Sequence, residues 1–177
     1  MKLSKAISPE CVRHKLTATT KLGVIEELIH VLDGAGKIGN PKLALKAVLE
    51  REKKMTTGMR DGIAIPHAKS DEVETLVAAV GVCPEGIDFE AMDKKPSTIF
   101  VLTLSPANRA GPHIQFIGDV NRILIHEEER ARILAAESDE SLHDLLVAER
   151  PEPAEEDDDE DDEEDEDLDA SENDSAE

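Results

Sequence analysis

The stretch of this sequence that is best equipped for chemistry runs from residue 51 to residue 69 and reads REKKMTTGMRDGIAIPHAK. A loop with two threonines and two glycines leads into a short apolar strand, Ile63-Ala64-Ile65, which Pro66 and His67 follow. The proline ring fixes its own φ angle and so restricts how the chain leaves the strand. We therefore predict that His67 lies just past a strand end, on a stiff backbone, where a reactant can approach it.

A histidine held in this way suits the transfer of a phosphoryl group. With an unperturbed pKa of about 6.5, much of the imidazole is neutral near pH 7 and has a lone pair available. One ring nitrogen can attack phosphorus while a hydrogen bond to the other nitrogen fixes the tautomer. An ordinary structural or surface histidine has the same local pattern, so the spacing alone leaves both interpretations open.

Two further residues strengthen the phosphoryl hypothesis. His113 follows Gly111-Pro112 and is therefore expected in the first turn of a helix, where free N–H groups attract anions and disfavour imidazolium. A neutral His113 could donate a hydrogen bond to a phosphoryl oxygen. Arg51 offers a planar, permanently charged fork for phosphate oxygens. Taken singly, His113 also fits a partly buried helix-start residue, and Arg51 a solvated charge at a helix end.

The elements that must position these residues alternate between helices and strands. Two short, nearly unbroken apolar runs, at 76–82 and 99–104, are typical of strands that are covered on both faces. Residues 1–150 are therefore predicted to form one α/β domain with helices on both faces of one sheet. Amphipathic spacing predicts helices over 19–33, from Pro41 onward, and over 113–125, 127–136 and 139–149, the last capped by Ser138-Asp139.

The charge of the chain is concentrated at its end. Residues 151–177 carry 18 of the 41 acidic residues and none of the 20 basic ones. Because like charges repel and almost nothing apolar is available for burial, this composition predicts a disordered acidic C-terminal tail. We expect the tail to be dispensable for folding and for phosphoryl transfer. It could serve as a sink for basic proteins or cations, although such tails more commonly improve solubility.

Several classes of function find no support in the sequence. The remaining histidines show no metal-ligand spacing, and the glycines form neither a GxGxxG nor a Walker loop, so we expect no metal and no organic cofactor. A strongly negative chain without a basic patch argues against nucleic-acid binding. With no secretory leader and no apolar run of about 18–20 residues, the sequence predicts a cytoplasmic protein without membrane insertion.

The chain resembles the enzyme IIA family of the fructose/mannitol type in the bacterial sugar phosphotransferase system, including its nitrogen-related branch. The likeness covers residues 3–148 and is carried by three features in order. These are LEREKKMTTGMRDGIAIPHAK, then GIDFEAMDKKPSTIFVLTLSP, then the helix that begins near His113. The resemblance implies a three-layer α/β/α sandwich with one mixed β-sheet. It also implies that His67 is phosphorylated, that His113 is a second active-site histidine and that Arg51 contacts the phosphate.

The resemblance also implies partners. The donor would be a small histidine-phosphorylated carrier protein, and the acceptor a sugar permease domain or a regulated protein. The leading hypothesis is therefore a phosphotransferase that carries phosphoryl groups between proteins. The alternative is a non-transport regulatory module, of the nitrogen-branch type, that controls a partner through its phosphorylation state.

Overall fold

The computed structural model describes residues 3–108 and 111–148, so the predicted tail at 151–177 lies outside the described residues. Within them, one mixed sheet is built from β1 (Val12–Arg13), β2 (Ile63–Ala64), β3 (His67–Lys69), β4 (Val77–Ile87) and β5 (Ser97–Ser105). Strand β5 is antiparallel to β4 and, along its other edge, parallel to β2 and β3; β1 pairs in parallel with β4. The apolar runs at 76–82 and 99–104 thus form the two central strands, as predicted.

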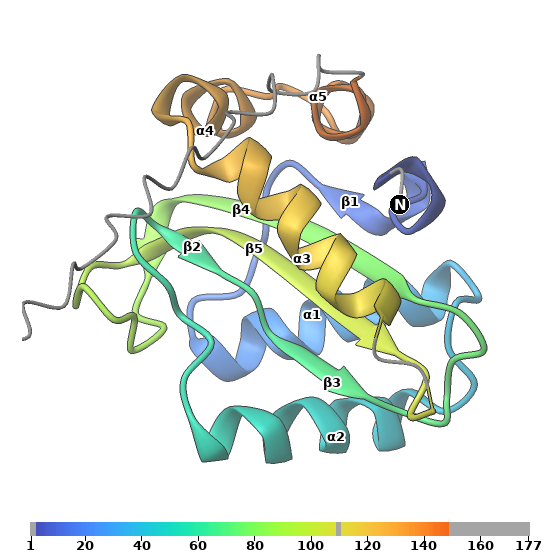
Figure 1. The fold of residues 1–177 in the computed structure, drawn as a ribbon. Helices are drawn as coiled ribbons and strands as arrows, with labels where there is room; N and C mark the ends of the chain where they lie inside the picture. The colour runs from blue at the N-terminus through green and yellow to red at the C-terminus, as the bar shows by residue number, and fades with distance from the viewer. Residues whose placement is uncertain (1–2, 109–110, 149–177) are drawn as a thin grey trace, which may run out of the picture.

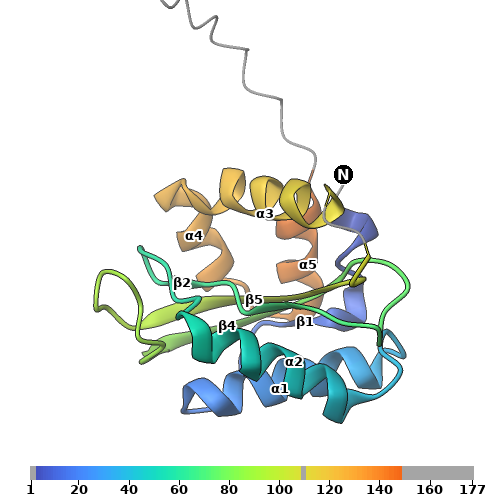
Figure 2. The ribbon, with the colours of Figure 1, turned by 60° about the horizontal axis from the view of Figure 1, so that its bottom comes forward.

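Helices cover both faces of this sheet (Figure 1). Figure 2 shows α1 and α2 on one face and α3, α4 and α5 on the other, which confirms the three-layer α/β/α sandwich. Two short 3-10 helices, Leu3–Lys5 and Pro9–Cys11, precede β1. The α-helices are α1 (Lys21–Gly34), α2 (Pro41–Lys54), α3 (Gly111–Leu124), α4 (Glu127–Leu134) and α5 (Asp139–Val147).

Local sequence explains where these helices begin. The side chain of Thr20 accepts a hydrogen bond from the N–H of Gly23 and caps α1. Asn40 does the same for α2, where Pro41 occupies the first helical position and has no N–H to leave unsatisfied. The sheet separates two apolar cores, and the chain's three phenylalanines are fully buried in them.

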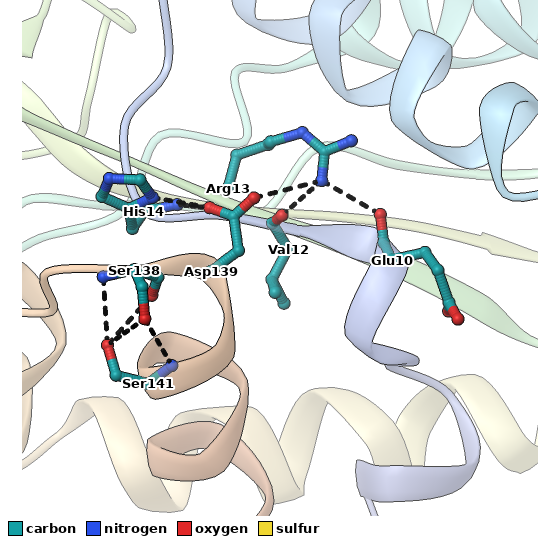
Figure 3. Close-up of polar contacts among 7 residues, drawn as sticks. All are labelled: Glu10, Val12, Arg13, His14, Ser138, Asp139 and Ser141. Atoms are coloured by element: carbon teal, nitrogen blue, oxygen red, sulfur yellow. Dashed lines mark hydrogen bonds and ion pairs between the residues drawn. The ribbon is translucent and has the colours of Figure 1, made fainter.

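A polar cluster attaches the C-terminal helix α5 to the first strand (Figure 3). The carboxylate of Asp139 accepts hydrogen bonds from the backbone N–H of His14 at 2.8 Å and from its ring Nδ1 at 2.6 Å. Arg13 lies 3.5 Å from the other carboxylate oxygen. Ser138 caps this helix, as the sequence predicted, and it forms a capping box with Ser141. His14 therefore has a structural role.

The prediction of one strand over Ile63–Ile65 with His67 just beyond it is wrong in one respect. The strand ends at Ala64, and His67 is itself the first residue of a new short strand, β3. Pro66 separates the two because it lacks the N–H that a continuous ladder requires. Its carbonyl still accepts a hydrogen bond from the N–H of Thr103 on β5, at 3.0 Å, so both segments stay on the same neighbour.

Candidate active site

The structure brings Arg51, His67 and His113 to one cleft. Arg51 lies in the last turn of α2, His67 opens β3 and His113 lies in the first turn of α3. Figure 1 shows α2 running alongside β3, with the N-terminal end of α3 near the C-terminal end of β5. The cleft has a volume of about 500 Å³ and is also lined by Ala47, Glu50, Lys54, Ala68, Lys69 and Ser105.

The imidazole of His67 is half-buried and held by its own backbone. Its Nδ1 lies 2.8 Å from the carbonyl oxygen of Ile65. Because a carbonyl only accepts hydrogen bonds, Nδ1 must carry the proton, which leaves the lone pair on Nε2. Burial lowers the pKa of His67, the hydrogen bond to Ile65 opposes this, and the charge of Arg51 lowers it further. The imidazole is therefore neutral at neutral pH, and its available lone pair is on Nε2.

A continuous chain of hydrogen bonds links His67 to the end of α2. The N–H of Ile65 donates to the carbonyl of Thr57 at 3.0 Å, and the N–H of Thr57 donates to the carboxylate of Glu52 at 2.9 Å. The hydroxyl of Thr57 donates to the other carboxylate oxygen at 2.5 Å. Glu52 directly follows Arg51 in the helix. The same network therefore fixes the backbone that carries both Arg51 and His67.

Glu52 is buried together with a cation from α1. Lys21 Nζ lies 2.8 Å from Glu52 and 2.6 Å from the exposed Glu90, and it also stands over the ring of Phe89. Burial alone would raise the pKa of Glu52, but the hydrogen bonds from Lys21 and Thr57 lower it below its usual range. The carboxylate therefore stays ionised and contributes stability at neutral pH, and this contribution is lost as the pH falls through its lowered pKa.

We expect Glu52→Ala to lower the free energy of unfolding by about 3 kcal/mol at pH 7, because Lys21 keeps only the exposed Glu90 as a partner and the buried Thr57 loses its acceptor. Glu50→Ala, on the same helix, is the matched control. Its pair with Lys46 is exposed and 3.8 Å long, so its loss should cost less than about 1 kcal/mol. Urea denaturation measures both. Equal losses would show that Glu52 does not hold this end of α2.

His113 faces His67 across the cleft. Their ring centroids are 5.1 Å apart and the rings are tilted by 42°. Burial lowers the pKa of His113, and the nearby His67, Lys69 and Arg51 lower it further, so its imidazole is neutral at neutral pH. Its Nδ1 is buried and has no hydrogen-bond partner among the described residues. This agrees with the sequence-based expectation of a neutral imidazole at a helix start.

Sequence reasoning missed several residues of the site. Lys69 and Lys54 add positive charge to the cleft, which suits a dianion. Lys69 could have been found from strand alternation, since it stands two residues after His67 and so on the same face. The role of Glu52 could not be predicted from the sequence, because a glutamate among other charged helix residues is usually exposed to solvent. Ser105 depends on strand register, which local sequence does not reveal.

The titration of His67 can be followed by NMR. We expect its imidazole to titrate below the ordinary value of about 6.5 in the unphosphorylated protein, and Arg51→Gln to move the midpoint upward. Lys53→Gln, an equal change of charge outside the cleft, should leave it in place. The pKa of His67 is lower in the folded protein than in the unfolded chain, so on acidification below about pH 6.5 the unfolded chain binds the imidazole proton first. The free energy of unfolding therefore falls as the pH falls through this range. A wild-type midpoint at or above 6.5 would contradict the lowered pKa of His67.

Comparison with known proteins decides the family. Residues 5–148 match the family described as phosphoenolpyruvate-dependent sugar phosphotransferase system, EIIA 2. The chain belongs to this family. EIIA domains are phosphotransferases that accept a phosphoryl group on histidine and pass it on, and this chain is a phosphocarrier of that type. The resemblance inferred from the sequence is thus confirmed.

Individual relatives come from both branches of the EIIA family. The chain is 42% identical over 128 residues to the "PTS system fructose-specific EIIA component" of Haloferax volcanii, covering 72% of this chain and 83% of that protein. It is 32% identical over 158 residues to the "Nitrogen regulatory protein" of Escherichia coli, covering 88% and 95%. The fold matches enzyme IIA in the complex of mannitol IIA with phosphorylated IIB from Escherichia coli, with a TM-score of 0.68, 24% identity and coverage of 79% and 96%.

The structure also bears on membrane insertion, metal binding and the histidines outside the cleft. Among residues 3–108 and 111–148, no helix is long and apolar enough to cross a membrane. In the same residues, no group of three or more His, Cys, Asp or Glu side chains is placed to hold a metal ion. His30 and His126 are exposed, and His143 Nε2 lies 3.3 Å from the carbonyl of Ile7; none of these three histidines lines the cleft.

Proposed function

We propose that this EIIA domain carries its phosphoryl group on Nε2 of His67. The observation that carries the proposal is the 2.8 Å contact between Nδ1 and the Ile65 carbonyl, inside a cleft that also holds Arg51 and His113. The contact fixes the tautomer and turns the lone pair of Nε2 toward a reactant. The cationic surroundings favour a dianion over an ordinary structural role for this histidine.

In the proposed transfer, the lone pair of His67 Nε2 forms the new P–N bond. The bond between phosphorus and the donor's nitrogen breaks, and its electron pair returns to the donor. His67 keeps its proton on Nδ1, so the ring becomes cationic as the bond forms. The Ile65 carbonyl stabilises this cation, since a hydrogen bond to an ionised donor is stronger than a neutral one. Transfer to the acceptor is the reverse process.

Arg51 and His113 are assigned supporting roles. A loose phosphoryl transition state spreads negative charge over three equatorial oxygens, so the protein acts mainly by positioning donors around them. The guanidinium of Arg51 binds two such oxygens in this proposal. The neutral imidazole of His113, 5.1 Å from His67 between centroids, donates one further hydrogen bond.

The donor in this proposal is a small histidine-phosphorylated carrier protein, and transfer takes place in the cytoplasm. The acceptor is a sugar permease domain. The fold match to a IIA protein solved in complex with phosphorylated IIB supports an acceptor of this kind. A regulated partner protein is the second candidate, favoured by the 95% coverage of the nitrogen regulatory relative.

The direct test is incubation of the full chain with a carrier protein that phosphoenolpyruvate keeps phosphorylated. We expect one phosphoryl group per chain, mapped by mass spectrometry to His67. A second incubation with a phosphorylatable permease domain separates the two acceptors, because a transport component passes its label on. Label on any residue other than His67 would refute the site.

A further inference from the structure

Strand β5 begins and ends with a buried serine, and neither hydroxyl has a hydrogen-bond partner within residues 3–108 and 111–148. Ser97 is 0% exposed and Ser105 is 1% exposed. Neither Oγ has a hydrogen-bond partner among the residues that the structure describes. A buried hydroxyl without a partner is unfavourable, and such groups are uncommon in native proteins. Each one therefore calls for an explanation.

The register of the sheet places only Ser105 beside the proposed nucleophile. In the parallel pairing of β3 with β5, His67 lies opposite Thr103 and Lys69 lies opposite Ser105. Paired residues and alternate residues share a face, so His67 and Ser105 lie on the same side of the sheet. Ser105 lines the cleft together with His67 and His113, whereas Ser97 does not.

The neighbouring hydroxyl on that face is already engaged. Thr103 Oγ1 donates to the carbonyl of Val77 at 3.2 Å. The Ser105 hydroxyl, in contrast, has no acceptor among the described residues. Strand spacing and rise place the Cβ atoms of His67 and Ser105 about 8 Å apart. An imidazole with a phosphoryl group on Nε2 is long enough to bridge this distance. Rotation about χ1 of Ser105 is the movement that would turn its hydroxyl toward that group.

We propose that Ser105 Oγ donates a hydrogen bond to an oxygen of the phosphoryl group on His67. The inference rests on the proposed phosphorylation of His67 and adds a further residue to that site. No covalent bond forms at Ser105, and its hydroxyl keeps its proton. The phosphoryl oxygen supplies an acceptor that this hydroxyl does not find among the described residues. Ser105 thus favours the phosphorylated state over the free one.

The test compares Ser105→Ala with Ser97→Ala, a matched loss of an unpartnered buried hydroxyl on the same strand. Each chain is equilibrated with the phosphorylated carrier protein, and the equilibrium constant for transfer is measured along with the ³¹P chemical shift. We expect Ser105→Ala to reduce that constant roughly 10- to 100-fold, as for a lost hydrogen bond to a charged group, and to move the ³¹P signal. Ser97→Ala should match the wild type in both.

Two results would overturn the proposed role of Ser105. A Ser105→Ala protein with the wild-type equilibrium constant, or with an unmoved ³¹P signal, would overturn the inference even if its melting temperature had changed. Both variants should melt at or above the wild-type temperature, because each removes an unsatisfied group. If mass mapping finds no phosphoryl group on His67 of the wild type, the proposed function fails and the inference falls with it. If His67 is labelled and the two variants behave alike, only the inference fails.

Discussion

His67→Gln is expected to abolish phosphorylation of the chain. The substitution removes the only nucleophilic atom that we assign to the reaction, Nε2, and keeps a polar side chain of similar reach. Among the other described residues that line the cleft, His113 is also a neutral imidazole, but its assigned role is to donate a hydrogen bond to the phosphoryl group and not to attack phosphorus. We therefore expect uptake to fall to the background of the assay, a larger effect than that of any other single substitution in the cleft.

The assay for His67→Gln uses transfer of labelled phosphoryl group from phosphoenolpyruvate through the carrier protein. The wild-type adduct should be labile in acid and stable in base, as a phosphoramidate is. His126→Gln, a change at an exposed histidine away from the cleft, should be labelled normally. Because His67 is only half-buried, the variant should keep a cooperative thermal transition. A folded variant that still takes up label would move the acceptor elsewhere, and an acid-stable adduct would direct attention to Thr56 or Thr57.

Much of the fold could be predicted from local patterns. The runs at 76–82 and 99–104 identified β4 and β5 because a strand buried on both faces has no polar interruption. The helices were found because their apolar residues repeat with helical spacing. Strand β1, Val12–Arg13, escaped prediction because two residues are too few to show any period. The order and direction of the strands also had to come from the structure, since pairing joins segments far apart in the sequence.

Some residues of the candidate site could also be predicted from the sequence, and others could not. His67 and His113 could be proposed because a proline, a glycine or a helix start lies next to each of them in the sequence. Arg51 could be proposed mainly through the family resemblance, because a charge near a helix end is common. Glu52 and Ser105 could not be found, since their importance depends on burial and on partners that come from distant segments. Sequence shows which groups could react, and the structure shows which groups hold them in place.

Arg51→Gln is expected to slow phosphoryl uptake roughly 100-fold, because the loss of one preorganised donor to a developing anion has an effect of that order. The side chain lines the cleft, and its charge lowers the pKa of His67. Arg51 Nη1 also donates to the carbonyl of Met55 at 2.9 Å, which helps to end α2. Losing that exposed hydrogen bond should cost about 1 kcal/mol of stability, too little to unfold the domain.

Two comparisons separate the chemical role of Arg51 from these other effects. Lys53→Gln removes one positive charge from the same helical turn outside the cleft, so it should leave the rate nearly unchanged. Arg51→Lys keeps the charge but lacks the planar fork, and should recover only part of the rate because a lysine binds one phosphate oxygen at a time. Rates are measured at pH 8, where His67 is neutral in every variant, so the upward shift of its pKa in Arg51→Gln does not contribute. If Arg51→Gln and Lys53→Gln slow uptake equally, Arg51 acts only through the general charge of the cleft, and its assignment as a phosphate ligand is wrong.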